Sequence, residues 1–206
     1  MRYTGPKNRL SRRENLDLGM KTLGSKSQAN LLKKINVMPG QHGTRLRRKL
    51  SEHSRQLREK QKLRFSFGLT EKQLKNYFAV ASRRRGNTGV HLSELVERRL
   101  DNVVYRMGFA PTRASARQLV THGHFQIDKK IVDIASYSVK EGEVVSFAKE
   151  DSKKIPYVEA YMTNNETFLP EWLELKGKTG VLVKAPDSSL IEKQLNLRLI
   201  IEFYSR

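Results

Sequence analysis

Two short motifs contain residue types that commonly do chemistry, but each lacks the spacing its chemistry needs. His122-Gly123-His124 offers two imidazoles for a metal ion, without a nearby cysteine or a matched carboxylate to complete the ligand set. Gly177-Lys178-Thr179 matches the end of a phosphate-binding loop, yet the first glycine of that loop would fall at Trp172. We expect a pair of polar loop histidines and a hairpin turn instead.

The other residues with catalytic potential also have simpler explanations. Glu94 and Glu97 could act as a carboxylate pair, but Arg98 follows them on the expected helix, and exposed ion pairs account for them. The serines do not occur in a Gly-x-Ser-x-Gly setting, and the chain has no cysteine. The sequence therefore predicts a binding protein rather than an enzyme, with no catalytic residue, metal or cofactor.

Positive charge is the strongest signal in the sequence. The 206 residues include 40 Lys and Arg against 21 Asp and Glu, a formal net charge of +19. Residues 1–90 hold 23 of these cations and 5 of the acids, whereas residues 91–206 hold 17 and 16. This asymmetry indicates a basic segment joined to an ordinary folded module, and a polyanionic partner such as nucleic acid.

The elements that would carry this charge divide the chain into three parts. Residues 1–43 read as an extended basic arm, which is either a mobile tail or, as we favour, a segment that orders against phosphates. Residues 44–90 are expected to form a helical domain, with helices over 44–64 and from Thr70, that the C-terminal residues 187–206 complete.

Residues 91–186 are expected to form the ordinary module, and the fold class is α+β. The pattern predicts a helix over 92–107, a second helix from Thr112 to about Val120, and then a small antiparallel sheet. The expected strands, in order along the chain, are 125–127, 131–134, 137–139 and 144–148, with a turn at Asp128-Lys129. Beyond them we expect a short helix within 155–162 and a hairpin over 172–183. Alternating apolar residues then predict a strand over 190–204.

Several motifs in this order resemble a known family. Residues 99–108 (RLDNVVYRMG) and 112–120 (TRASARQLV) are similar to the core of the αL RNA-binding module. The motifs at 39–43 (PGQHG), 59–62 (EKQK) with Phe67-Gly68, and 201–206 (IEFYSR) extend the likeness over nearly the whole chain. Together they resemble the bacterial-type small ribosomal subunit protein 4 family. This chain lacks the N-terminal zinc-binding cysteines of many members, and it has Asp128-Lys129-Lys130 where members often have Asn-Gly.

The resemblance implies a ribosome-bound protein of the cytoplasm or of an organelle. It implies a primary binder of small-subunit ribosomal RNA that nucleates subunit assembly and contributes to translational accuracy. Its expected partners are that RNA, neighbouring small-subunit proteins, and messenger RNA near the side where it enters the subunit. No membrane partner and no small-molecule substrate are expected.

Two surfaces are expected to contact RNA, because arginine and lysine neutralise phosphates and arginine bridges them bidentately. The first surface is the arm and the first helix: Arg2, Lys7, Arg12, Arg13, Arg45, Arg47, Arg48 and Lys49. The second is the face of the αL module: Arg99, Arg113, Arg117, Gln118, His122, His124, Lys129 and Lys130. For Arg98, an ion pair with Glu94 one turn earlier is the favoured interpretation.

Three other classes of protein compete with this one. The αL module also occurs in pseudouridine synthases and tyrosyl-tRNA synthetases, but this chain has no room for their catalytic domain. A helix-turn-helix regulator built on residues 92–120 would read duplex DNA, usually as a dimer, and the sequence shows no dimerisation helix. A membrane-surface protein is disfavoured, because the basic helix lacks a broad apolar face.

Overall fold

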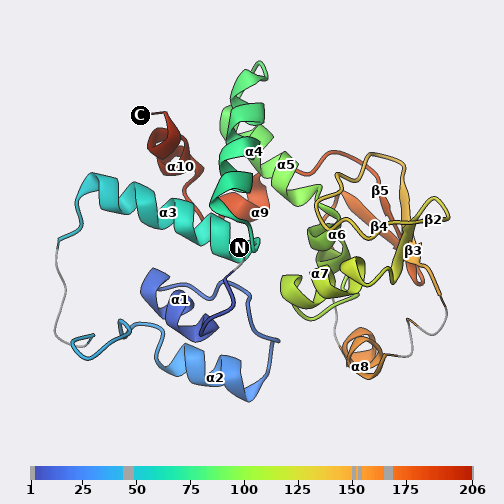
Figure 1. Cartoon of the computed structure of the whole chain (residues 1–206), viewed down its shortest axis with the longest axis horizontal. Helices are drawn as coiled ribbons and strands as arrows, with labels where there is room; N and C mark the ends of the chain where they lie inside the picture. Colours follow the sequence, from blue (N-terminus) through green and yellow to red (C-terminus); the bar gives the residue numbers. More distant parts are fainter. Residues whose placement is uncertain (1–2, 44–48, 150–151, 153–154, 165–168, 206) are drawn as a thin grey trace. The chain divides into compact units, whose positions relative to one another are not determined.

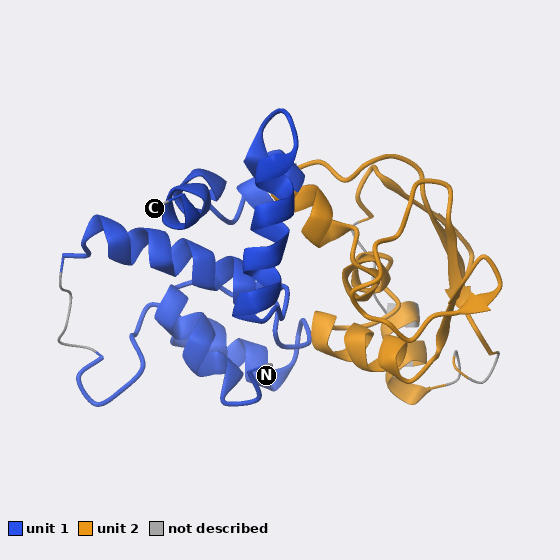
Figure 2. Cartoon of the chain, turned by 45° about the horizontal axis from the view of Figure 1, so that its top comes forward, with its two compact units in different colours: residues 1–91, 189–206 blue, residues 92–188 orange. Residues whose placement is uncertain are grey.

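The computed structural model divides the chain into two compact units, which Figure 2 colours separately. Unit 1 comprises residues 1–91 and 189–206, and unit 2 comprises residues 92–188. The residues that the structure describes are 3–43, 49–149, 152, 155–164 and 169–205. The mixture of helices with one antiparallel sheet confirms the α+β class.

The basic N-terminal segment of unit 1 is folded, so its prediction as an extended arm is wrong. It contains α1 (Lys7–Glu14) and α2 (Lys26–Lys33), and the side chain of Ser25 caps α2 by accepting from the backbone N–H of Gln28. The apolar side chains that it buries are Leu10, Leu18 and Leu31. These leucines are too widely spaced to give a periodic signal, yet each fills a site in the core of unit 1.

The next two helices partly follow the sequence pattern. Helix α3 (Glu52–Ser66) begins later than expected, because Ser51 caps it and residues 49–51 are not helical; residues 44–48 lie outside the described part. Helix α4 (Glu71–Arg83) begins with the predicted capping box. The backbone N–H of Gln73 donates to Thr70 Oγ1 at 3.3 Å, and the backbone N–H of Thr70 donates to Gln73 Oε1 at 3.1 Å.

The C-terminal segment is helical, which corrects the strand predicted over 190–204. It forms α9 (Ser189–Glu192) and α10 (Leu197–Tyr204), and α10 packs against α3 (Figure 1). Leu197, Ile200 and Ile201 are spaced for one face of a helix, although Leu197, Leu199, Ile201 and Phe203 also alternate as in a strand. The side chain of Asn196 accepts from the backbone N–H of Leu199 and starts the helix.

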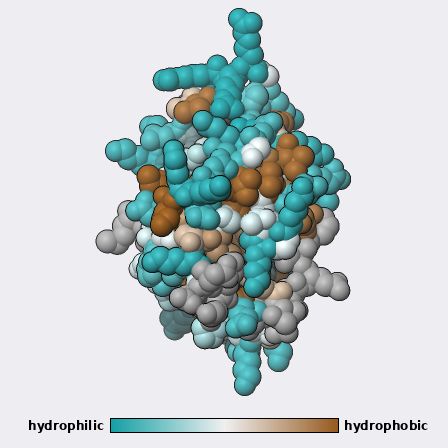
Figure 3. All heavy atoms as spheres, turned by 90° about the vertical axis from the view of Figure 1, so that its right-hand side faces the viewer, coloured by the Kyte–Doolittle hydropathy of each residue, from teal (hydrophilic) through white to brown (hydrophobic). Residues whose placement is uncertain are grey.

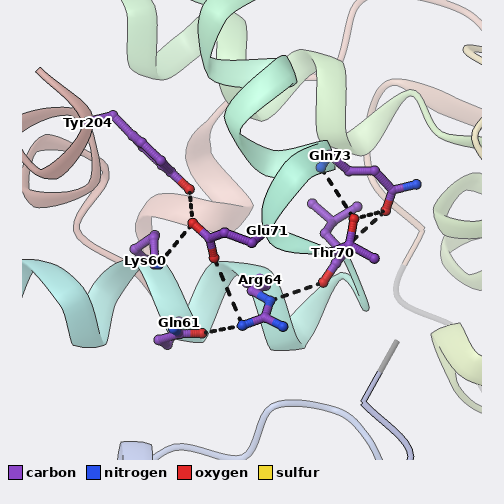
Figure 4. Close-up of polar contacts among 8 residues, drawn as sticks. Lys60, Gln61, Arg64, Thr70, Glu71, Gln73 and Tyr204 are labelled. Carbon is purple, nitrogen blue, oxygen red and sulfur yellow. Dashed lines mark hydrogen bonds and ion pairs between the residues drawn. The ribbon is translucent and has the colours of Figure 1, made fainter. Parts of the chain in front are cut away.

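One carboxylate joins α3, α4 and α10 (Figure 4). Glu71 Oε1 accepts from Lys60 Nζ at 2.9 Å and from the Tyr204 hydroxyl at 2.8 Å, while Arg64 Nη1 lies 3.9 Å from Oε2. Burial alone would raise the pKa of Glu71. The hydrogen bonds from Lys60 and Tyr204, together with the nearby charges, outweigh this effect, so the pKa of Glu71 is lower than its ordinary value. Burial and Glu71 together raise the pKa of the Tyr204 hydroxyl.

We expect Glu71→Gln to lower the free energy of unfolding at pH 7 by about 1 kcal/mol, because the carboxylate is partly screened by solvent. Since the folded-state pKa is lowered, this contribution is present above the ordinary pKa and is lost as the pH falls through the folded value. Urea unfolding followed by far-UV circular dichroism at pH 7 and at about pH 3.5 checks the result. Glu192→Gln, at an exposed carboxylate of the same unit, is the control. A loss that stays constant between the two pH values would contradict the assignment.

Unit 2 begins with two helices where the sequence predicted one over 92–107. Helix α5 (Thr88–Glu97), which starts in unit 1, ends before Arg98, and α6 (Leu100–Arg106) begins after Arg99. Arg99 has an extended backbone, with φ −63° and ψ 135°, and forms a bridge with Ser138. The backbone N–H of Val139 donates to the carbonyl of Arg98 at 2.9 Å. A distant segment therefore takes the hydrogen bonds that would have continued the helix.

A five-stranded antiparallel sheet follows α7 (Arg113–Thr121), whose predicted cap at Thr112 is confirmed. Its strand order is β2-β1-β3-β5-β4. The strands are β1 (Phe125–Ile127), β2 (Lys130–Ile131), β3 (Val144–Phe147), β4 (Leu173–Lys176) and β5 (Thr179–Leu182). The predicted hairpin and the turn at Asp128-Lys129 are confirmed, as is a helix near 155–162, α8 (Pro156–Asn164). The strand expected at 137–139 is only an isolated bridge.

The core of unit 2 lies between α6, α7 and the inner face of the sheet. Its aromatic centre is Phe109, Phe125 and Phe147, whose ring centroids lie 4.8–5.9 Å apart. On the face drawn in Figure 3, apolar spheres form small separate groups among hydrophilic side chains. Within the described residues, no helix has the length and apolar character needed to cross a membrane.

Candidate nucleic-acid interface

Helix α7 and the residues that follow it carry most of the second expected surface. Gln118, His122, Lys129 and Lys130 are exposed, whereas Arg113, Arg117 and His124 are half-buried. The turn that presents Lys129 is tight, since Asp128 and Lys129 both have positive φ. The difference in exposure matters, because the half-buried Arg113 and Arg117 are held by partners inside the unit.

The first group of partners centres on Glu97 and is called the Glu97 cluster (Glu97, Asn102, Arg106, Arg113). The Glu97 side chain is 1% exposed and accepts from Arg106 through Nη2 at 2.6 Å and Nε at 3.1 Å. The Asn102 amide N–H donates to the same carboxylate and to the Glu97 carbonyl at 3.0 Å. Burial lowers the pKa of Arg106, but the charge and hydrogen bonds of Glu97 raise it more, so Arg106 stays charged.

Arg113 belongs to the same cluster through the other end of the Asn102 amide. Its Nε donates to Asn102 Oδ1 at 2.8 Å, and its guanidinium carbon lies 4.6 Å from the ring centroid of Tyr105. Burial, followed by the positive charge of Arg106, lowers the pKa of Arg113 to about 10. The group is therefore still a cation at neutral pH, in a position where charge is costly without a counter-ion.

The second group is the Asp101 cluster (Arg99, Asp101, Arg117). Arg99 donates to Asp101 through Nε at 3.1 Å and Nη2 at 2.8 Å, and Arg117 Nη1 lies 3.5 Å from Asp101 Oδ2. The Arg99 side chain is only 1% exposed, whereas that of Arg117 is 25% exposed. Burial thus corrects the expectation that Arg99 contacts a partner: its guanidinium holds Asp101 in the interior.

The two histidines lie together beside this surface. Their ring centroids are 6.2 Å apart, and His124 Nδ1 lies 3.0 Å from the Ser152 hydroxyl. Burial, with the nearby charges of His122 and Lys149, lowers the pKa of His124. No group of His, Cys, Asp and Glu within the described part of the chain could hold a metal ion.

Comparison with known proteins matches both units of the chain. Residues 2–97 match the family described as "Ribosomal protein S4/S9 N-terminal domain", and residues 98–145 match the "S4 domain". Small ribosomal subunit protein uS4 of Thioalkalivibrio sulfidiphilus is 47% identical over 208 residues, and that of Janthinobacterium sp. is 44% identical over 207 residues. Both alignments cover 100% of this chain and 99% of the relative.

The chain belongs to the small ribosomal subunit protein uS4 family. This confirms the resemblance drawn from the sequence motifs. The uS4 family consists of structural ribosomal proteins rather than enzymes. The S4 domain match begins at Arg98, so it contains most of the Glu97 cluster and the whole Asp101 cluster.

The first expected surface of this uS4 family member lies in unit 1 and is only partly described. Arg13 and Lys49 are exposed and Lys7 is half-buried, while Arg2, Arg45, Arg47 and Arg48 lie outside the described residues. Arg12 is turned toward its own chain, donating through Nε to the Val37 carbonyl at 2.9 Å and through Nη2 to the Met38 carbonyl at 3.2 Å. It ties α1 to the segment that follows α2.

Sequence reasoning missed Arg106, Tyr105 and Asn102 as parts of the second surface. Arg106 lies nine residues from Glu97, a separation that matches no helical pairing, because the break at Arg99 redirects the chain. The ion pair expected at Arg98 is confirmed, with Arg98 Nε 3.3 Å from Glu94 and a second contact to Glu141.

We expect Arg99→Ala to destabilise unit 2 by about 3–5 kcal/mol, because the substitution leaves the buried Asp101 carboxylate without its main partner. Lys140→Ala, which removes an exposed cation from the same unit, should change stability by less than about 0.5 kcal/mol. Chemical unfolding followed by the fluorescence of Trp172, the one tryptophan of the chain and a buried residue of unit 2, measures both. Equal effects of the two substitutions would contradict an interior role for Arg99.

Proposed function

We propose that this chain binds small-subunit ribosomal RNA as a structural component of the ribosome. The observation that carries the proposal is the gathering of four arginines in the two clusters, on the same expected surface as exposed lysines. Glu97 holds Arg106 directly and is linked to Arg113 through Asn102, and Asp101 contacts both Arg99 and Arg117. Each cluster therefore fixes the positions of two arginines, and Lys129 and Lys130 are exposed on the same expected surface.

Phosphate oxygens are the partner that this chemistry favours. Guanidinium groups bind them by charge-assisted hydrogen bonds, and each phosphate that is neutralised releases condensed counter-ions. The proposed surface also carries the side-chain donors and acceptors of Gln118, His122 and His124. Recognition would depend mainly on the shape and backbone of folded RNA, because the deep groove of an RNA helix hides its base edges.

The proposal places this RNA contact within the small subunit of a ribosome in the cytoplasm or in an organelle. The full-length similarity to proteins named small ribosomal subunit protein uS4 supports it. Its finer parts are early binding that nucleates assembly, contact with neighbouring small-subunit proteins, and a position near entering messenger RNA that affects decoding accuracy. These parts rest on the motifs shared with the family, including residues 99–108 and 112–120.

Unit 1 contributes the second contact in this proposal. Its described candidates are Lys7, Arg12, Arg13 and Lys49, to which the proposal adds Arg2, Arg45, Arg47 and Arg48 from outside the described part. Glu14, the acid at the end of α1, is buried, and its Oε1 lies 3.1 Å from Arg58 Nη1, whereas Arg9 and Arg13 of the same helix are exposed. Two separate basic surfaces would allow one chain to hold more than one RNA helix.

The double substitution Arg113→Ala with Arg117→Ala should weaken binding to small-subunit ribosomal RNA by about 1–3 kcal/mol for each phosphate that is no longer bound by an arginine. The slope of log affinity against log salt should become shallower by about 0.7–0.9 for each such phosphate. Filter binding or fluorescence anisotropy over a salt series measures both quantities. Circular dichroism confirms that the variant is folded.

The matched control is Lys176→Ala with Lys184→Ala, which removes two cations from the β4–β5 hairpin region, where the side chains are 74% and 60% exposed. We expect a much smaller change from this pair. If the two double variants showed the same decrease in affinity, only total charge would matter, and the assignment of α7 as a binding surface would be wrong.

A competition experiment separates this function from duplex-DNA binding by α6 and α7. A fluorescent small-subunit RNA fragment is bound to the chain, and unlabelled RNA or duplex DNA of equal length is added. We expect the RNA to compete at far lower concentration, since the proposed contacts fit folded RNA. Equal or better competition by the DNA would contradict the proposal.

A further inference from the structure

Asn102 connects a buried carboxylate to an arginine on the proposed RNA-binding surface. Its amide nitrogen donates to the Glu97 carboxylate and to the Glu97 carbonyl, so the amide can have only one orientation. Its oxygen, Oδ1, then faces α7 and accepts from Arg113 Nε at 2.8 Å. Glu97 holds Arg106 directly through two further hydrogen bonds.

We propose that Glu97 and Asn102 are positioning residues, which set the orientation of the Arg106 and Arg113 guanidinium groups for phosphate binding. The inference rests on the proposed function, because it concerns the same surface of unit 2. It goes further by assigning a role in RNA affinity to an acidic and a neutral residue. On charge alone, an acidic residue would oppose binding to RNA.

The geometry restrains both guanidinium groups in two ways. A guanidinium is planar, so a hydrogen bond at Nε and a stacked ring together define the plane of the group. Arg113 donates from Nε to Asn102, and its guanidinium carbon lies 4.6 Å from the centroid of the Tyr105 ring. Arg106 is held through Nε and Nη2 by one carboxylate. A side chain restrained in this way loses less conformational entropy when it binds a phosphate.

The buried negative charge of Glu97 is compensated by a cation of the same cluster. Glu97 is 1% exposed, so its negative charge is covered by Arg106 and does not face a bound polyanion directly. The charges of Glu97 and Asp101 favour the charged form of Arg113, although burial disfavours it more strongly. The carboxylates therefore help to keep an inward-held arginine cationic at neutral pH.

Glu97→Gln tests the proposal by the direction of its effect. The substitution makes the chain one unit more positive, so unspecific attraction would tighten RNA binding. The positioning role predicts instead that binding weakens about tenfold, because Arg106 and Asn102 lose their anchor. The control is Glu141→Gln, which makes the same charge change at a half-exposed carboxylate whose partner, Arg98, keeps Glu94. Tighter binding by both variants would overturn the proposal.

Asn102→Ala combined with Arg113→Ala provides a second test that does not depend on net charge. We expect Asn102→Ala to weaken RNA binding about tenfold in the natural chain, but less than about twofold when Arg113 is already alanine. Affinities are compared under conditions in which Trp172 fluorescence shows that each variant is folded. A merely structural role would give the same factor in both backgrounds, and that result would overturn the proposal.

A third readout separates failure of this inference from failure of the proposed function. The NMR order parameter of the Arg113 Nε–H group, measured without RNA, should fall in Asn102→Ala and stay unchanged in Glu141→Gln. If Arg113→Ala leaves RNA affinity unchanged, the proposed function of the α7 surface fails, whatever the order parameter shows. If Arg113→Ala weakens binding but Asn102→Ala changes neither the order parameter nor the affinity, only the positioning role fails.

Discussion

Two buried carboxylates, Glu97 and Asp101, organise the positive surface of unit 2. An uncompensated charge in a protein interior costs several kcal/mol, so each acid requires close and well-directed donors. Arginine meets this need by donating two hydrogen bonds to one carboxylate, as Arg106 and Arg99 do here. A second arginine then joins each cluster, at positions 113 and 117, and Arg117 is more exposed than Arg99.

The break between α5 and α6 makes this arrangement possible. In a continuous helix, Arg99 would not have an extended backbone. The backbone hydrogen bonds between residues 98–101 and residues 135–139 could then not form. Periodicity could not predict the break, because Leu92, Val96 and Leu100 continue one apolar face across it. The contacts that decide it come from a segment about 35 residues later, and local sequence does not contain them.

The same reasoning explains which other elements could be predicted. Caps at Thr70 and Thr112 and the turn at Asp128-Lys129 are local, so residue type and spacing predicted them correctly. The C-terminal segment has apolar residues that suit either a strand or a helix, and packing on α3 decides for the helix. For the candidate site, the cations on α7 could be proposed from charge, whereas the burial of Arg99 and the link through Asn102 depend on tertiary structure.

In this account, arginines and lysines in fixed positions bind structured RNA. A salt titration tests this claim most directly. The complete chain is titrated with purified small-subunit ribosomal RNA at several salt concentrations. We predict a linear fall of log affinity with log salt concentration, with a slope corresponding to several phosphates. We also predict tighter binding to this RNA than to large-subunit RNA at every salt concentration. An affinity independent of salt, or equal for both RNAs, would contradict the account.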